Sequence, residues 1–478
     1  MTNRPATYPR AFCAALLSAA LVASFAAGQQ GGTTRVKSPT IAGGGGASAG
    51  GATRVGGTVG QPAAGTSSGG VYTVGGGNNP PTGTQATPTP TPTPTPSPTP
   101  QPTPAVAAFQ FAQATYGVVE DCASVTLTVT RTGSFVSAMT VDYATQDGTA
   151  SGRADYALAL GTLRFDVGET SKTFDVLVGE DSHVEGAEGF TVALSNPTGG
   201  AALGEPATAT VEIADDASEP QSNAIDDAQG FVCRHYQDFL GRQPDPAGLA
   251  FWTNEITSCG GDAQCVEVKR INVSAAFFLS IEFQETGFLA HRFHKAAYGN
   301  LPGLPAPVRL RDFLRDARRL GQGVRVRPGD WQQRLEENKE AYAAEFAARP
   351  EFAAAYPAAM TPAAFVDALN MNAGGVLSPA EREQLIADLA GGLRTRAQVL
   401  RAVAVDADCA RAEHSRAFVL MQYFGYLRRD PDDAPDTNFD GYHFWLAKLN
   451  QFNGNFVRAE MARAFIESVE YRARFGQP

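Results

Sequence analysis

The sequence is poor in the residues and motifs that most enzyme and metal-protein classes require. Its 478 residues include 6 Cys, 6 His and 3 Trp. No two Cys/His pairs have the spacing of a zinc site. A His-Glu-x-x-His motif, a P-loop and a dinucleotide fingerprint are also absent. We therefore expect a protein that is not an enzyme.

The chain also lacks an excess of basic charge. Its net charge is -11 and its pI is about 5.1, so nucleic acid is not an expected partner. Residues 106–219 carry 4 basic and 17 acidic residues, a net of 4 - 17 = -13, whereas residues 220–478 carry 29 and 32. General solubility would have spread the acidic residues along the chain. Their concentration indicates a specific role for residues 106–219.

After residue 28 no apolar run is long enough to span a bilayer. Before it, Arg4 and Arg10 precede a mostly apolar stretch at 11–27, and small residues follow. This pattern predicts a signal peptide over residues 1–28 and a secreted or cell-surface protein. A retained membrane anchor is the minority interpretation, because the run is short. Residues 29–105 are rich in Gly, Ser and Thr and then in Thr-Pro, which predicts a disordered linker.

One short stretch, residues 178–188, holds four carboxylates: Glu180, Asp181, Glu185 and Glu188. It lies between two runs of alternating apolar residues, so the acids belong to a loop between two β-strands. Like charges raise the cost of ionising their neighbours, and a bound cation removes that cost. Oxygen ligands without Cys favour a hard cation, Ca²⁺ before Mg²⁺. A solvated acidic rim that binds nothing is the alternative.

Alternating apolar runs separated by turn signals recur throughout residues 106–216, and seven or so short strands predict an antiparallel β-sandwich. The motifs Asp147-Gly-Thr-Ala, Ala154-Asp-Tyr, Leu194-Ser-Asn-Pro and Val211-Glu-Ile-Ala-Asp-Asp resemble the Calx-beta family in order and spacing. The resemblance implies an immunoglobulin-like sandwich that binds Ca²⁺ through loops at one end. Asp155 and Tyr156 belong to the motif, and we interpret them as a turn residue and a core aromatic.

Carried over onto this sequence, the resemblance implies a calcium-ligand set of eight acids. They are Glu120, Asp147, Glu180, Asp181, Glu185, Glu188, Asp215 and Asp216. The chain has Glu180-Asp181-Ser182 where binding members have three aspartates. We therefore expect one or two ions.

After a short polar linker at 217–224, residues 225–478 have apolar residues at helical spacing and little alternation, which predicts an all-α domain. An internal repeat organises it: Gly-Arg-Gln-Pro-Asp at 241–245 and Arg-Asp-Pro-Asp at 429–432 are each followed by a Trp and a Ser-x-Glu-aromatic. This half resembles an uncharacterised helical family of bacterial secreted proteins, which is similar to phycobilisome linkers. The resemblance implies a helical fold but no reaction, and we expect this domain to be an interaction or scaffold module.

Two smaller features complete the predicted sites. Asp436, Asn438 and Asp440 occupy the first, third and fifth places of an EF-hand-like loop, but the twelfth place is Ala447. An incomplete Ca²⁺ loop and an ordinary Asx-rich turn are equally compatible with this pattern. Cys259 and Cys265 flank a Gly-containing loop, which predicts a local disulfide in an oxidising compartment.

Together these features predict a secreted or cell-surface calcium-binding protein with several domains and no enzymatic activity. The expected partners are calcium ions and, for the helical domain, a cell-envelope glycan or another surface protein. An adhesin or glycan-binding protein is the alternative, with Trp252 and Trp445 as stacking platforms, although core packing of these residues is favoured. A hydrolase ranks third.

Overall fold

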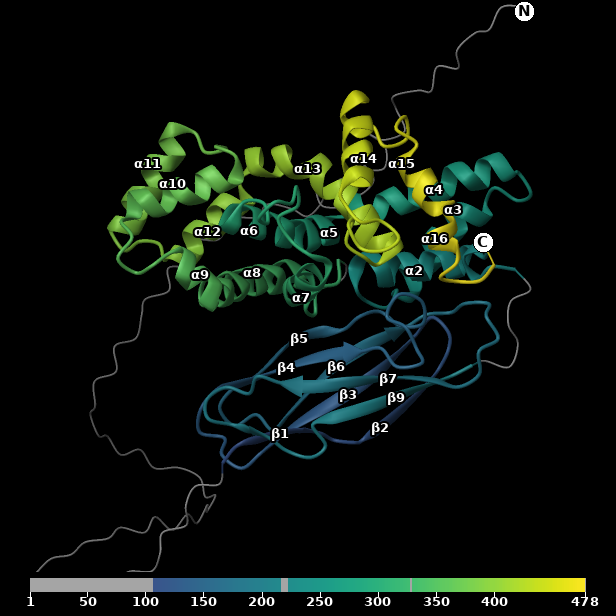
Figure 1. Ribbon diagram of the computed structural model, residues 1–478, viewed down its shortest axis with the longest axis horizontal. Helices are drawn as coiled ribbons and strands as arrows, with labels where there is room; N and C mark the ends of the chain where they lie inside the picture. Colours follow the sequence, from purple (N-terminus) through teal and green to yellow (C-terminus); the bar gives the residue numbers. More distant parts are fainter. Residues whose placement is uncertain (1–105, 216–221, 327–328, 478) are drawn as a thin grey trace, which may run out of the picture. The chain divides into compact units, whose positions relative to one another are not determined.

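Residues 106–215 fold into a sandwich of two β-sheets, as their alternating pattern predicted. The computed structural model describes residues 106–215, 222–326 and 329–477. One sheet has the strand order β6-β3-β1-β8 and the other β2-β9-β7-β4-β5 (Figure 1). The strands are β1 (Ala108–Phe111), β2 (Thr115–Val119), β3 (Ala123–Thr132), β4 (Met139–Gln146), β5 (Leu160–Phe165), β6 (Ser171–Val178), β7 (Glu188–Ser195), β8 (Ala202–Leu203) and β9 (Thr208–Ala214).

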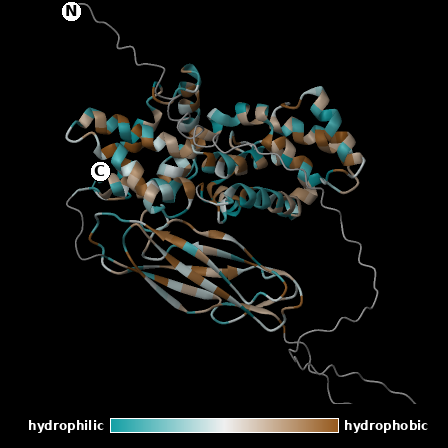
Figure 2. Cartoon of the chain, turned by 180° about the vertical axis from the view of Figure 1, so that it is seen from behind, coloured by the Kyte–Doolittle hydropathy of each residue, from teal (hydrophilic) through white to brown (hydrophobic). Residues whose placement is uncertain are grey.

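The core of the sandwich comes from every second residue of its strands. In β9, Ala209, Val211 and Ile213 are buried and the residues between them are exposed. Figure 2 shows the same alternation of hydrophobic and hydrophilic residues along the other strands. Because a slip of one residue would turn every apolar side chain to the solvent, this pattern fixes the register of the strands.

The sandwich departs from a purely antiparallel arrangement at its first strand. β1 pairs with β3 in antiparallel fashion but with β8 in parallel, and β2 pairs in parallel with β9. The reason is that the chain changes sheets between Phe111 and Thr115, so that one extended segment contributes a short strand to each sheet.

The rest of the described chain is helical, as predicted. Its elements are η2 (Ala224–Asp226), α2 (Ala228–Leu240), α3 (Pro246–Thr257), α4 (Ala263–Leu279), α5 (Ile281–Glu285), α6 (Gly287–Tyr298), α7 (Leu310–Gly321), α8 (Trp331–Ala347), α9 (Pro350–Ala355), α10 (Pro362–Ala373), α11 (Pro379–Ala390), α12 (Arg396–Val405), α13 (Ala407–Gln422), η3 (Tyr423–Leu427), α14 (Asp440–Gln451), α15 (Met461–Ile466) and α16 (Val469–Arg472). Asp, Ser or Thr side chains cap the N-termini of several of these helices, as at Asp227, Ser378 and Thr395.

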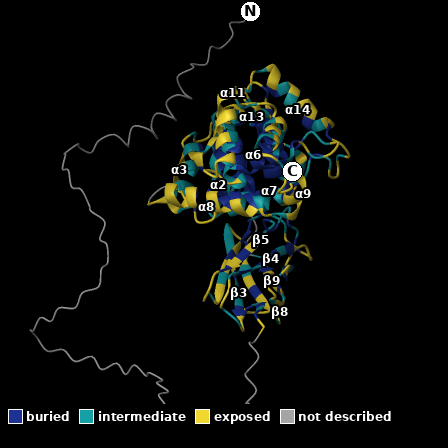
Figure 3. Ribbon diagram, turned by 90° about the vertical axis from the view of Figure 1, so that its left-hand side faces the viewer, coloured by how far each residue is buried: buried dark blue, intermediate teal, exposed yellow. Residues whose placement is uncertain are grey.

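Two buried clusters, rather than one, hold the helical domain together. The first joins the two ends of the domain, because residues from α2 and α4 pack with residues from α13 to α16. The second is formed by the middle of the domain, from α6 to α13. Figure 3 shows these buried residues on the inner faces of the helices. The first and last repeat copies therefore share a core although they are far apart in the sequence.

The repeat motif builds the same ion pair twice. Arg242 binds both carboxylate oxygens of Glu282, at 2.5 and 2.8 Å. In the last copy Arg429 binds Glu470 in the same way, at 2.6 and 3.0 Å. A two-pronged Arg–carboxylate pair fixes orientation as well as distance. The Arg and Glu of the motif therefore have a structural role in each copy.

The glycine and tryptophan of the motif have structural roles as well. A Cβ added at Gly248 would collide with the hydroxyl of Tyr236, and one added at Gly441 would collide with the hydroxyl of Tyr423. Trp252 and Trp445 are partly buried against the core shared by the two copies. These contacts explain why each copy has Gly and Trp on its second long helix.

The residues that the structure describes form two disulfides. One joins Cys259 to Cys265, the pair predicted from the sequence, and the other joins Cys122 of the sandwich to Cys233 in α2. Cys409 is a buried free cysteine.

The predicted signal peptide and linker at residues 1–105 lie outside the described residues, as does most of the linker at 217–224. Among the residues that the structure describes, no helix has both the length and the apolar character needed to cross a membrane.

Candidate metal centre

Three carboxylates meet at one end of the sandwich. Asp155, Asp181 and Glu185 each offer one oxygen, and these oxygens lie within 4.8 Å of one another. Asp181 and Glu185 come from the loop between β6 and β7, and Asp155 comes from the segment between β4 and β5. In the described part of the chain this is the only group of three or more His, Cys, Asp or Glu residues with such spacing.

Asp181 is at the centre of this group. It is only 1% exposed, and its Oδ1 accepts a hydrogen bond of 2.7 Å from the backbone N–H of His183. Its Oδ2 is buried and has no hydrogen-bond partner among the described residues. Burying a carboxylate oxygen without a partner is costly, so this oxygen needs a cation or a proton. It is therefore the strongest single indication of a ligand.

Two further predicted acids hold the loop in place. Glu120 accepts a hydrogen bond of 3.0 Å from the backbone N–H of Asp181. Asp215, which directly follows β9, accepts hydrogen bonds from the backbone N–H groups of Glu185 at 3.3 Å and Gly186 at 2.9 Å. Acids from distant parts of the sequence thus converge on the loop through hydrogen bonds to its backbone.

Asp155 is the member of the group that sequence analysis did not assign to the site. Its Oδ2 accepts a hydrogen bond of 2.5 Å from the N–H of Ser151, so it does form the turn that was predicted. Its backbone oxygen also accepts a hydrogen bond of 3.0 Å from Gly179, and the next residue, Tyr156, pairs with Val178 at the end of β6. These long-range bonds bring the turn to the acidic loop, and no local spacing reveals them.

The remaining predicted ligands lie outside the three-residue group. Asp147 accepts hydrogen bonds from the hydroxyl of Tyr156 at 2.5 Å and from the N–H of Gly152 at 2.9 Å. Glu180 is partly exposed beside Asp181, and Glu188 begins β7. Asp216 lies outside the described residues.

Crowding of the acids changes their protonation. Burial, opposed in part by a backbone hydrogen bond, raises the pKa of Asp181. Burial and the charge of Asp181 raise the pKa of Glu185. Burial and the charges of Asp155 and Glu185 raise the pKa of Glu188 to about 7. Without a cation, this end of the sandwich therefore holds protons at a pH where isolated carboxylates have lost them.

The raised pKa of Glu188 predicts a pH effect on stability. Between about pH 4.5 and 7 the folded, cation-free protein binds more protons at Glu188 than the unfolded chain does, so this contribution to stability is present at low pH and is lost as the pH rises. Glu188→Gln mimics the protonated form. We expect the variant and the wild type to melt at similar temperatures at pH 5 in EDTA, and the variant to melt higher at pH 8.

Differential scanning fluorimetry across this range measures the effect. Subtracting the melting temperature of the wild type from that of Glu188→Gln at each pH cancels the contribution of other groups that titrate in the same range. A difference that stays constant from pH 5 to pH 8 would show that Glu188 is not coupled to its neighbours in this way.

The acids of the EF-hand-like stretch have partners within the protein. Asp436 is bound to Arg429 at 2.7 Å. The Oδ1 of Asn438 accepts a hydrogen bond of 2.9 Å from the N–H of Asp440, which is an Asx-type turn at the start of α14. The Asx-rich turn is therefore present in the structure, and Asp436 and Asp440 do not belong to the three-carboxylate group at the end of the sandwich.

The fold and the site define a two-sheet β-sandwich with carboxylates clustered in the loops at one end. Residues 104–217 match the Calx-beta domain family, and residues 218–287 match a domain of unknown function (DUF4214). The chain thus contains a Calx-beta domain followed by a DUF4214 domain, in the predicted order.

The Calx-beta part is similar to segments of known proteins. Sodium/calcium exchanger 1 of Mus musculus is 37% identical over 129 residues, which cover 23% of this chain and 13% of the exchanger. The apo-form Calx CBD1 domain is 36% identical over 23% of this chain and 98% of that domain, with a TM-score of 0.23. The calcium binding domain CBD12 of CALX1.1 is 37% identical over 23% of this chain and 44% of that structure, with a TM-score of 0.22. This chain therefore spans only a small part of the exchangers that it matches.

Proposed function

We propose that this chain is a secreted or cell-surface, non-enzymatic protein whose Calx-beta domain binds Ca²⁺ and whose helical domain is an interaction module. Asp155, Asp181 and Glu185 are the central ligands. The observation that carries the proposal is the buried, unpartnered Oδ2 of Asp181 within a group of three converging carboxylates. The N-terminal pattern of residues 1–28 supports secretion, and the lack of catalytic motifs supports a non-enzymatic role.

The donor set favours calcium over other metals. All three central ligands are carboxylates, and hard oxygen donors suit Ca²⁺, Mg²⁺ and Mn²⁺ rather than zinc or copper. Ca²⁺ accepts six to eight oxygens in irregular geometry, whereas Mg²⁺ demands a near-octahedral shell. Ligands contributed by an irregular loop and a turn meet the first requirement more easily. Extracellular sites of this kind bind in the range of about 10⁻⁴–10⁻³ M.

Calcium should stabilise the folded protein. Binding only to the native state adds about 2.7 kcal/mol when free Ca²⁺ is a hundredfold above Kd. We expect the melting transition of the full chain to rise by several degrees in Ca²⁺ relative to EDTA, and calorimetric titration to give a saturable heat.

Mg²⁺ at the same concentration serves as the control for ionic strength and should give a smaller shift. Identical melting in Ca²⁺ and EDTA together with no heat of binding would disprove the proposed function.

A further inference from the structure

We infer that the helical domain positions the calcium ligands of the sandwich, so that cation binding and contact between the two domains are thermodynamically coupled. This inference rests on the proposed function and concerns the regulation of the same site. The two domains belong to one compact unit. Three of the chain segments that carry site acids are each bonded to the helical domain within three residues of the acid.

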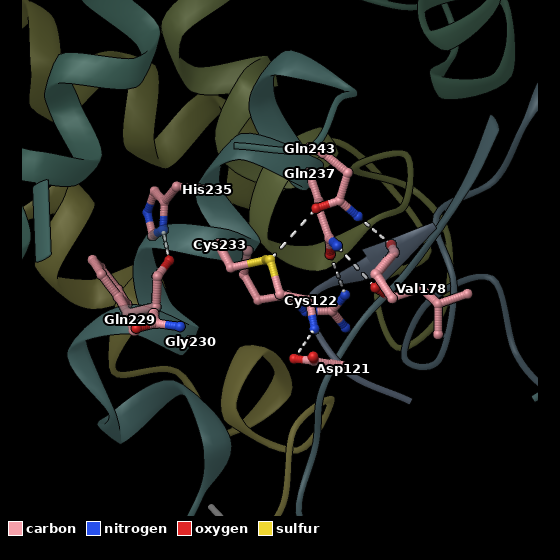
Figure 4. The surroundings of a disulfide bond; sticks show 12 residues. Asp121, Cys122, Val178, Gln229, Gly230, Cys233, His235, Gln237 and Gln243 are labelled. Atoms are coloured by element: carbon pink, nitrogen blue, oxygen red, sulfur yellow. Dashed lines mark hydrogen bonds between the residues drawn. A yellow bond between two sulfur atoms is a disulfide. The ribbon is translucent and has the colours of Figure 1, made fainter. Parts of the chain in front are cut away.

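The segment of Glu120 is held by a disulfide. Cys122 follows Glu120 by two residues and is bonded to Cys233 in α2 (Figure 4). The carbonyl oxygen of Ala123 also accepts a hydrogen bond from the side-chain amide of Gln243. The turn between β2 and β3 is therefore attached to the helical domain both covalently and through its backbone.

The segment of Asp155 is held by arginines. The backbone oxygen of Ala154 accepts a hydrogen bond of 2.5 Å from Arg234, and that of Arg153 accepts one from Arg474. The guanidinium group of Arg153 in turn pairs with Glu470 at 2.6 Å. Glu470 is the acid of the last repeat copy, so the turn that carries Asp155 is attached to the Arg–Glu pair of that copy.

The acidic loop is held on both sides of Asp181. The amide of Gln237 donates a hydrogen bond of 2.8 Å to the backbone oxygen of Val178, as Figure 4 shows. The hydroxyl of Ser182 donates one of 2.9 Å to the backbone oxygen of Phe475. Between them, Gly179 has no side chain, which leaves the space that the guanidinium group of Arg234 occupies.

The partners on the helical side are themselves fixed. Arg234, Arg428 and Arg474 are almost completely buried. Arg428 and Arg474 pair with Asp238, and Arg234 donates a hydrogen bond of 2.9 Å to the side chain of Gln237. Arg474 binds Asp238 at 3.0 and 3.2 Å. Groups held in this way cannot follow a moving loop without exposing unpaired buried charges.

The consequence is preorganisation. A loop that is ordered before the cation arrives does not lose that conformational freedom on binding, so the site binds more tightly. By reciprocity, a cation that binds better when the domains are in contact must also strengthen the contact. Coupling of this kind typically changes affinity by about 5- to 150-fold.

The test is the calcium Kd of the full chain, measured by calorimetry for matched pairs of variants. Replacing the interdomain disulfide (Cys122→Ser with Cys233→Ser) should weaken Ca²⁺ binding at least fivefold. Replacing the local disulfide (Cys259→Ser with Cys265→Ser) should leave Kd within twofold, because it removes a disulfide that does not reach the sandwich.

A second pair does not depend on disulfides. Arg153→Gln removes the contact with Glu470 at a partly exposed position and should also weaken Ca²⁺ binding. Glu282→Gln breaks the equivalent Arg–Glu pair of the first copy. Because that pair is not bonded to Arg153, this variant should bind Ca²⁺ as tightly as the wild type. Hydrogen exchange of residues 473–476 should slow when Ca²⁺ is added to the wild type, but not when it is added to Arg153→Gln.

The outcomes separate the two proposals. If the wild type binds no Ca²⁺, the proposed function fails and the coupling fails with it. If the wild type binds Ca²⁺ and both Arg153→Gln and the interdomain disulfide variant keep the same Kd, the proposed function stands and the coupling is wrong.

Discussion

Replacing Asp181 by Asn should strongly weaken calcium binding. The amide keeps the size of the side chain and the oxygen that accepts the hydrogen bond from His183, so the loop should keep its shape. It removes the buried negative charge that faces Asp155 and Glu185. Because affinity in such sites depends on the number of ligand charges, we expect Kd to rise on the order of a hundredfold.

The same substitution should have the opposite effect on the cation-free protein. A buried carboxylate with an unpartnered oxygen and a raised pKa destabilises the fold, and a neutral amide relieves that cost. Asp181→Asn should therefore melt higher than the wild type in EDTA and lower than the wild type in Ca²⁺. Calorimetric titration measures Kd. Thermal melting in EDTA and in Ca²⁺ shows whether the order of the two melting temperatures reverses.

Asp175→Asn is the matched control, because it makes the same chemical change at an exposed carboxylate on β6. It should change neither Kd nor the difference between the two buffers. A Ca²⁺-induced rise in melting temperature that is as large in Asp181→Asn as in the wild type would mean that Asp181 is not a ligand.

The acidic loop could be found from the sequence, but the complete centre could not. The acids between Glu180 and Glu188 lie close enough together in the sequence for their charge to stand out, and the strands on either side place them in a loop. Asp155 is separated from that loop by more than twenty residues, and it reaches the site because Tyr156 pairs with Val178 across the sandwich. Local spacing predicts that such a residue forms a turn, which is correct, but it does not reveal that the residue also belongs to the carboxylate group.

The same limit applies to the contact between the domains. Apolar periodicity predicted both the sandwich and the helices, because each depends on short-range patterns. The Cys122–Cys233 disulfide spans 111 residues and joins two domains with separate cores. For Cys122, Cys233 and Cys409 the sequence predicts only that at least one stays free or pairs outside the chain, and in the structure the free one is the buried Cys409.

The largest loss of stability should follow from replacing Asp316 in α7. Its carboxylate is completely buried and accepts hydrogen bonds from His294 at 2.7 Å, from Tyr342 at 2.9 Å and from both terminal nitrogens of Arg349 at 2.9 and 2.7 Å. Asp316→Ala removes the charge that compensates Arg349 and leaves three buried donors without their acceptor. Breaking a buried pair in this way costs about 3–5 kcal/mol. Urea unfolding followed by helical circular dichroism measures it.

Asp312→Ala is the control for Asp316→Ala. Asp312 lies one turn earlier on α7, where its side chain is 49% exposed and pairs with Arg315. Its loss should therefore cost about 0–1 kcal/mol. The pH dependence supplies a second check. Although burial opposes it, hydrogen bonds and charges from His294 and Arg349 hold the pKa of Asp316 well below its usual range. The stability that Asp316 adds is therefore complete above the usual pKa of an aspartate, about 4, and is lost as the pH falls below that value. The gap in unfolding free energy between the wild type and Asp316→Ala should narrow below pH 4, and a gap that widens there would contradict the buried ion pair.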